Sequence, residues 1–590
     1  MSSVLERRGA AARAGSVNKT RFLVAGIVAF AAVLGFWVWY AQRHPLGYTL
    51  FPVDLGVYRD GGLIVRHISP PYDAKLANPL YDWPLNDQSL KFTYTPFAAL
   101  VFAVVSFVPW SVLPRLSQLV NIAALLVATW CTMSALGYRD RRVLAGGALL
   151  GAAAGLLTEP VFRTLYLGQI NLILMALIIW DLRQKESRWW MGIATGFAAG
   201  VKLVPLIFIP YLLLTRKFRQ AAVATGAFVG TVLLGFVILP GDSKDWWLNG
   251  LFVQDGRTGF VGWGGNQSLR AIATRLAGSI NAATVPWVIA ALIVTVVGLL
   301  CAARLYRAGH PMLGILTTAL VGLLDSPISW DHHWVWVVPG MMAAAHYAVR
   351  GWRARRWGRA AGCAALAGGM FLVFAAWPGI LWSVLTTGPG NFTHGLIWSA
   401  PNTAVRKYIA LGDQPWFLEY HWRGLQNLGG NAFVLSGLLL LVILGFTALT
   451  ATPLASAPKD LIRLHCSSGR AERRGRWVVP NRMDLKVSSG HITLDFTEAV
   501  IMQRALHIAA EVRSGHITLI TKPGIVVDAD DVSVRSGRVK VRAPWGTDVP
   551  ELLRIDVAGK CGSGRIIARP PRRSFWQWLC CAPRPYAIAA

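Results

Sequence analysis

Residues 22–40, FLVAGIVAFAAVLGFWVWY, form an apolar run of the length that a helix needs to cross a lipid bilayer. Ten residues further on, the chain reads FPVDLGVYRDGGLIVR (51–66), which contains Asp54, Tyr58 and Arg59. The first run predicts a membrane helix, and the second places ionisable side chains near its outer end. Because a charge near lipid is costly, such groups are candidates for a functional site. For Asp54 alone, a solvated loop carboxylate is an equally good interpretation.

The composition of the whole chain is typical of a membrane protein. Of 590 residues, 54% are hydrophobic, 15% are charged and 26 are Trp, which is unlike a soluble enzyme. The formal net charge is +29, but the basic residues stand in short clusters between apolar runs, as in cytoplasmic loops. We therefore expect no nucleic-acid partner. The seven cysteines form no CxxC or Cys/His spacing, so neither a metal site nor a disulfide framework is expected.

The apolar segments predict an α-helical polytopic fold with about 12 membrane spans. They lie near residues 22–40, 116–136, 142–158, 166–182, 189–201, 203–214, 218–239, 284–304, 311–326, 333–349, 359–384 and 429–451. The basic clusters share one side of the membrane only if the apolar run 93–110 does not cross. We therefore predict a re-entrant or juxtamembrane helix there. This topology makes a multi-pass plasma-membrane protein, with the N-terminus and the C-terminal domain in the cytoplasm.

The chain is predicted to have two folded domains. A cytoplasmic basic tail (1–21) precedes a membrane domain (22–452), and a linker (453–462) leads to a soluble β-repeat domain (463–570) and a basic, aromatic tail (571–590). Ser-Gly pairs begin at residues 468, 489, 514, 536 and 563, at intervals of 21 to 27 residues, and each precedes alternating apolar and polar residues. This pattern predicts a small β-solenoid-like domain. It contains no acid/base or metal constellation, and its partner cannot be named from the sequence.

Polar residues recur at span ends that open on the outer side. Lys202 lies where Pro205 breaks an apolar run, and broken helices at membrane depth usually line a cavity. A lysine that reaches the membrane interface is the alternative. Asp54 is the candidate general base, and His332 and His333 are candidates, together with Lys202, for binding the donor phosphate. The candidate substrate-binding residues are Tyr58, Arg59, Tyr94, Gln169, Asn171, Asn266, Gln267, Arg270, Trp330 and Asp331.

These residue types together suit the transfer of a sugar from a lipid phosphate to a hydroxyl group. A carboxylate can take the proton of the acceptor hydroxyl, and lysine or histidine can stabilise the charge that grows on the departing phosphate. Amides pair with sugar hydroxyls, and an indole ring covers the apolar side of a sugar. Each signal is weak by itself, since a WDHHW turn also serves as an interface anchor.

The ordered motifs VDLGVYRDG, YTPF, LGQIN, GVKLVPLIFIPYLL, GNQSLR and SPISWDHHWVWVVP resemble glycosyltransferase family 87 over about residues 20–450. The resemblance implies a GT-C fold, an active site that faces outward, and α-1,2-mannosyl transfer with inversion from a polyprenyl-phosphate-mannose donor to a lipid-linked or glycan acceptor. It also implies that no metal and no cofactor take part, and that the base of the first outer loop is Asp54. The family does not normally carry a C-terminal repeat domain.

Two alternatives remain open on the sequence. A transporter or flippase of a polyprenyl-linked sugar also has broken helices and polar groups in the membrane. Such a protein would hold them at mid-depth, whereas here they gather at the outer ends of spans. The other alternative is an inactive membrane part that anchors a cytoplasmic scaffold.

Overall fold

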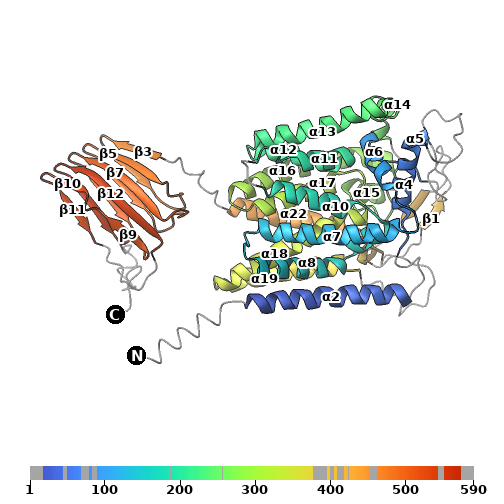
Figure 1. Cartoon of the computed structure of the whole chain (residues 1–590), viewed down its shortest axis with the longest axis horizontal. Coiled ribbons are helices and arrows are strands. Elements are labelled where there is room, and N and C mark those ends of the chain that lie inside the picture. Colours follow the sequence, from blue (N-terminus) through green and yellow to red (C-terminus); the bar gives the residue numbers. More distant parts are fainter. Residues whose placement is uncertain are drawn as a thin grey trace. The chain divides into compact units, whose positions relative to one another are not determined.

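The computed structural model divides the chain into two compact units, Met1–Ala451 and Thr452–Ala590, which are drawn in Figure 1 and considered one at a time. The predicted N-terminal tail up to residue 17, the end of the 359–384 span from residue 377, the linker up to residue 460 and the C-terminal tail from residue 573 lie outside the described residues. The structure describes residues 18–43, 50–67, 79–82, 90–184, 188–254, 257–376, 395–398, 404–407, 417–420, 422, 424–451, 461–542 and 551–572.

Six helices in the described part of the first unit are long and apolar enough to cross a membrane. Many of their apolar side chains are exposed, such as Val237 (79%) and Val285 (66%). In water such surfaces would be unfavourable, so they indicate contact with lipid. The helices are α2 (Lys19–Arg43), α7 (Leu113–Ala135), α13 (Phe218–Ile238), α16 (Ile280–Arg307), α19 (Trp357–Phe374) and α22 (Ala432–Thr450).

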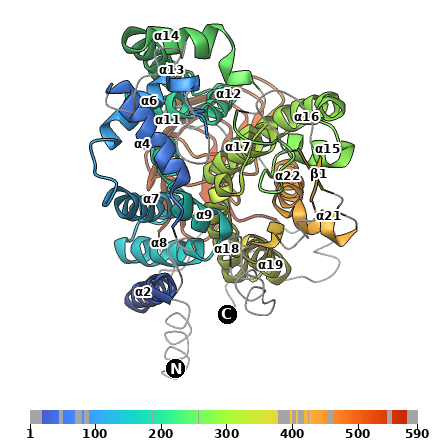
Figure 2. The same cartoon turned by 90° about the vertical axis from the view of Figure 1, so that its right-hand side faces the viewer.

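Shorter helices complete the bundle, and α9 and α17 are among the most enclosed. Figure 2 looks along the helices and shows α17 near the middle, in agreement with the burial of nearly all its side chains. The shorter helices are α8 (Arg141–Leu156), α9 (Glu159–Leu167), α10 (Asn171–Leu182), α11 (Ile193–Val201), α12 (Phe208–Leu214), α15 (Leu269–Ala277), α17 (Pro311–Asp325) and α18 (Val337–Arg353).

Other short elements lie at the helix ends. They are α4 (Val53–Val65), α5 (Pro79–Asp82), α6 (Pro96–Val105), α14 (Pro240–Ser243), α21 (Leu425–Gly430), the 3-10 turns η1 (Val204–Ile207), η3 (Leu251–Val253), η4 (Asp331–Trp336) and η5 (Leu396–Trp398), the π turn η2 (Lys244–Leu248), and the antiparallel pair β1 (Ala404–Lys407) and β2 (Phe417–Tyr420).

Two predicted apolar segments differ from single spans. The segment 166–182 does not form one helix: Gly168 has a left-handed backbone (φ 73°) that ends α9, and α10 starts at Asn171 after a bend of 118° between the two. In the run 93–110, helix α6 has only ten residues, which is too short to cross a bilayer. Its N-terminus is capped by Thr95, whose hydroxyl accepts a hydrogen bond from Ala98 N.

The second unit consists of two sheets in which all paired strands are parallel. In one sheet the strand order is β10-β12-β7-β5-β3, with β9 also beside β12, and in the other it is β11-β13-β8-β6-β4. The bounds are β3 (Leu461–Cys466), β4 (Arg470–Arg473), β5 (Arg482–Val487), β6 (His491–Asp495), β7 (Ala505–Val512), β8 (His516–Ile520), β9 (Ile525–Asp528), β10 (Val532–Val534), β11 (Arg538–Val541), β12 (Leu553–Cys561) and β13 (Arg565–Arg569).

Each Ser-Gly turn connects a strand of one sheet to a strand of the other, and the turns stack. His516 N donates to Gly490 O, and Arg565 N donates to Gly515 O. A side chain on Gly515 would collide with the backbone oxygen of Gly490, so the stack requires glycine. The order of the rungs is not the order of the repeats, since β12 lies between β7 and β10.

Candidate functional site

A cavity of about 590 Å³ lies at the end of the bundle that carries α4 (Figure 1). It is formed by α4, the residues before α6, the break between α9 and α10, the residues after α11, and η4, most of which face the viewer in Figure 2. Its volume is within the usual range for small-molecule sites. Nine of the residues predicted from sequence line it: Asp54, Tyr58, Tyr94, Gln169, Lys202, Trp330, Asp331, His332 and His333.

Lys202 is held between two other predicted residues. Helix α11 ends at Val201, and Lys202 has an extended backbone (φ −142°, ψ 130°) before the turn that contains Pro205. Its Nζ donates to Asn171 Oδ1 at 3.0 Å and lies 2.8 Å from His333 Nε2. When the lysine is charged, His333 Nε2 must accept this hydrogen bond. The partners explain how the cavity accommodates the ammonium group.

Asp331 orients its neighbour His332 and also pairs with a buried arginine. One carboxylate oxygen accepts from the backbone N of His332 (2.8 Å) and lies 3.0 Å from its Nδ1, and the other accepts from Arg163 Nε at 3.0 Å. A carboxylate at Nδ1 places the ring proton there, so Nε2 of His332 offers a lone pair. This Nε2 is buried and has no hydrogen-bond partner in the described part of the chain. It is therefore available to a ligand.

Both histidines reach the cavity, and their rings meet edge to face at 4.8 Å. Consecutive positions on an α-helix point in different directions, so the sequence predicts that only one of the two faces the cavity, and His332 is favoured because Asp331 could orient it. That expectation is wrong. The pair stands in the 3-10 turn η4 rather than in α18, and the backbone is kinked at Trp334 (ψ 17°).

Tyrosine and amide groups form the wall beside Asp54. Tyr58 donates to Gln169 Oε1 at 2.7 Å, and its hydroxyl lies 2.8 Å from that of Tyr94. Burial and the negative charge of Asp54 raise the pKa of Tyr94, so its hydroxyl stays protonated. Asp54 itself is half-buried in the first turn of α4, where the helix dipole favours a carboxylate.

The residues Asn266, Gln267 and Arg270 do not line the cavity. Asn266 donates to Val261 O and accepts from Ser329 N, and Gln267 donates to Gly264 O and Gly430 O. These bonds fix the loop before α15 against the segment that leads to Trp330. Arg270 lies 4.8 Å from the ring of Trp287. The motif GNQSLR therefore positions the wall of the cavity from outside it.

Arg59 also stays outside the cavity. It pairs with Asp60 at 3.8 Å and lies 6.0 Å from the ring of Trp110. Asn171 does not line the cavity either, and it acts through Lys202.

Two arginines of the cavity wall were not predicted. Arg163 was a detectable candidate, because it is the one basic residue of the mostly apolar stretch EPVFRTLYL. Arg257 gave no signal in the sequence, and it donates to Tyr81 O at 2.6 Å. Both add positive charge to a cavity that also holds Lys91 and Lys202. Among the residues that the structure describes, no group of three His, Cys, Asp or Glu side chains is placed to bind a metal ion.

Comparison with known proteins gives consistent matches. Residues 92–328 match the profile of glycosyltransferase family 87. Over 347 residues the chain is 30% identical to a polyprenol-phosphate-mannose-dependent alpha-(1-2)-phosphatidylinositol mannoside mannosyltransferase of Mycobacterium tuberculosis, with 57% of this chain and 77% of the relative covered. It is 34% identical over 311 residues to a polyprenol-phosphate-mannose-dependent alpha-(1-2)-phosphatidylinositol pentamannoside mannosyltransferase of Mycolicibacterium smegmatis, with coverage of 52% and 73%.

Proposed function

The chain belongs to glycosyltransferase family 87, and from this membership we propose that it transfers mannose from a polyprenyl-phosphate-mannose donor to a glycolipid or glycan acceptor, with inversion and an α-1,2 linkage. The names of the relatives support this donor and linkage, and they make a phosphatidylinositol mannoside the first acceptor to test. The observation that carries the proposal is one cavity that gathers Asp54, Lys202, His332 and His333 from distant segments. The alternative of a transporter gains no support from these relatives.

In the proposed reaction, the carboxylate of Asp54 takes the proton of the acceptor hydroxyl as its oxygen attacks the anomeric carbon. The bond from that carbon to the phosphate oxygen breaks on the opposite side, and polyprenyl phosphate leaves. Lys202 stands in the same cavity and would donate to the phosphate as its charge grows, and His332 would do so through Nε2 in its protonated form. Gln169, Tyr94 and Trp330 provide hydrogen bonds and an aromatic surface for the sugar.

For the fold, we propose a GT-C arrangement of twelve spans in the plasma membrane. In this arrangement the short helices α11 and α12 act as half-spans and the cavity opens outside. The proposed domains are 22–452 and 463–570, with the β-repeat domain and the N-terminus in the cytoplasm. The clusters of arginine support this orientation. A membrane-impermeant thiol reagent should label Val253→Cys, which is 67% exposed near the cavity, and should not label Arg356→Cys in intact cells. The reverse labelling would invert the topology.

The decisive experiment uses purified protein in detergent, without separated compartments. Synthetic polyprenyl-phosphate-mannose with a radiolabelled sugar is mixed with a phosphatidylinositol mannoside, and the labelled product is analysed for an α-1,2 linkage. Transfer in detergent supports a glycosyltransferase of this specificity. Movement of the donor across vesicles without any transfer in detergent would favour the flippase alternative.

A further inference from the structure

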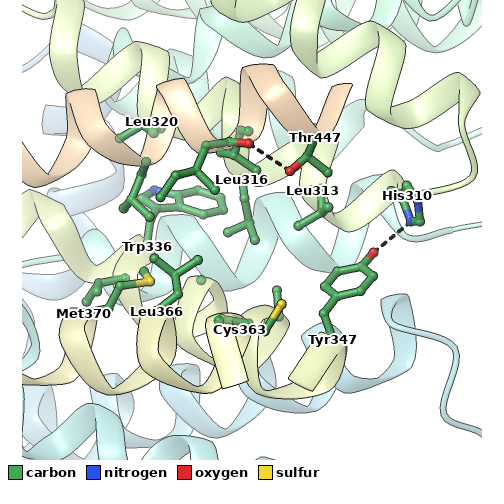
Figure 3. Close-up of a pocket in the computed structure, with 18 of the residues that line it drawn as sticks. His310, Leu313, Leu316, Leu320, Trp336, Tyr347, Cys363, Leu366, Met370 and Thr447 are labelled. Atoms are coloured by element: carbon green, nitrogen blue, oxygen red, sulfur yellow. Dashed lines mark hydrogen bonds between the residues drawn. The ribbon is translucent and has the colours of Figure 1, made fainter. Parts of the chain in front are cut away.

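A second cavity, of about 530 Å³, lies among α17, α18, α19 and α22. Figure 3 shows it with the side chains that surround it. No residue that lines it also lines the first cavity, which contains Asp54 and Lys202. Seven of the lining residues are Leu, and the others include Ala, Gly, Met370, Phe374 and two tryptophans. A polar metabolite would lose its hydrogen bonds to water in such a space, so the walls favour a hydrocarbon ligand.

The two ends of this cavity differ. At one end Tyr347 and His310 form a hydrogen bond of 2.8 Å between the tyrosine hydroxyl and Nδ1, and the other end is lined by Trp336, Leu320 and Met370 (Figure 3). Arg359, whose side chain is exposed, belongs to the lining as well. Arg359 stands near the start of α19, and Tyr347 lies in the last part of α18, which ends at Arg353. The positive charge therefore lies at the Tyr347 end.

The charged residues that surround Tyr347 and Arg359 in the sequence are all basic. The residues from 345 to 365 include five arginines and no Asp or Glu. An anionic group there would be attracted by Arg359 and its neighbours, with each basic residue adding to the attraction near a membrane surface. An apolar cavity with a basic end matches a molecule that has a hydrocarbon chain and an anionic head.

We propose that this cavity binds one acyl chain of an anionic phospholipid, with its phosphate beside Arg359. The acyl chain lies along α18 and extends toward Trp334, Trp336 and Val337, which line the end of the cavity opposite Tyr347. Trp334 and Trp336 belong to η4, the same turn that carries His332 and His333. The bound lipid is thus a part of the packing that holds the histidine pair, and it is distinct from the sugar donor.

The first test fills the cavity from α19. Gly362 lines it, and a Cβ built there meets no atom within 4 Å, so Gly362→Leu enters open space. Gly369, on the same helix, is equally free of neighbours and does not line the cavity, so Gly369→Leu is the matched control. Native mass spectrometry of protein from nanodiscs with equal phosphatidylglycerol and phosphatidylcholine counts the phospholipid that is retained. We expect Gly362→Leu to retain at least tenfold less than Gly369→Leu, and equal retention would overturn the proposal.

The second test concerns the head group. Arg359→Gln should lower the preference for phosphatidylglycerol over phosphatidylcholine at least threefold, whereas Arg353→Gln, which removes a nearby exposed charge outside the lining, should change it less. An unchanged preference in Arg359→Gln would refute the proposed place of the phosphate. Displacement of phosphatidylglycerol by an equal amount of polyprenyl phosphate would assign the cavity to the donor lipid instead.

A third measurement requires no substitution. Cys363 lines the cavity, whereas Cys301 is similarly half-buried and does not. Phosphatidylglycerol should slow the reaction of Cys363 with N-ethylmaleimide at least threefold and leave Cys301 unchanged. Equal rates for Cys363 with and without the lipid would contradict occupancy, whether or not the leucine variant folds.

Discussion

The helical unit and the β unit of this chain differ in how far apart in the sequence their contacting residues lie. In the β unit the strands that pair come from repeats 21 to 27 residues apart, except where β12 inserts between β7 and β10. In the helical unit, Lys202 and His333 are 131 residues apart, and Arg163 and Asp331 are 168 apart. A repeat period predicts the contacts between repeats, whereas a site in a helical bundle depends on how independent helices pack.

The largest effect should come from Asp54→Asn. An amide keeps the shape of the carboxylate but cannot take a proton, so the rate of mannose transfer should fall by about 10²–10⁴-fold. Initial rates in detergent measure the loss, with Asp60→Asn as the control, because Asp60 pairs with Arg59 and does not line the cavity. Near-normal turnover of Asp54→Asn would assign the base to another acid, with Asp331 the first candidate.

Arg163→Met should mainly destabilise the helical unit. It removes one partner of a buried pair, in which the side chains are 9% and 3% exposed, and leaves the Asp331 charge uncompensated. The free energy of unfolding should fall by about 3–5 kcal/mol. Unfolding of the full chain in mixed micelles checks this, and the double variant Arg163→Met/Asp331→Leu should recover part of the loss. If the single variant were as stable as the natural chain, this long-range ion pair would contribute little to the stability of the helical unit.

Lys202→Met should weaken use of the donor. The lysine makes a charge-assisted bond to Asn171, and bonds of this kind contribute about 1.5–3 kcal/mol. If the same strength is lost toward the donor phosphate, the KM for the donor rises about 10- to 150-fold. Lys244→Met, which removes an exposed charge outside the cavity, should leave both KM values unchanged. A change in the KM of the acceptor alone would place the donor phosphate elsewhere.

The smallest effects are expected in the β unit. Gly515→Ala forces a Cβ against Gly490 O and should lower the stability of this unit by about 1–3 kcal/mol, with mannose transfer unaffected. Proteolysis of the full chain in increasing urea measures it. Ser514→Ala removes only an exposed bond to Ser488 O and should cost less than about 0.5 kcal/mol. If both variants lost transfer activity, transfer would depend on the folding of the β unit.

Much of the architecture could be predicted because it depends on local properties. The runs 22–40 and 218–239 identify membrane helices by composition alone, and the Ser-Gly spacing identifies the parallel repeats. The break at Gly168 was not predicted, since a glycine in an apolar run is compatible with a continuous helix. The insertion of β12 was not predicted either, because a repeat period carries no information about the order of equivalent rungs.

Apolar runs, ordered motifs and the Ser-Gly spacing were enough to identify a membrane protein of glycosyltransferase family 87 with a β-repeat unit, and they provided a set of candidate polar residues. Which of these residues contact one another depends on how the helices pack. In the structure, Lys202 lies between Asn171 and His333, and Arg163 pairs with Asp331. Gln267 donates a hydrogen bond to the backbone of Gly430. The physical reason is that the apolar surroundings stabilise each helix separately. The rotation and depth of one helix against another depend on many small packing contacts, which no local pattern encodes.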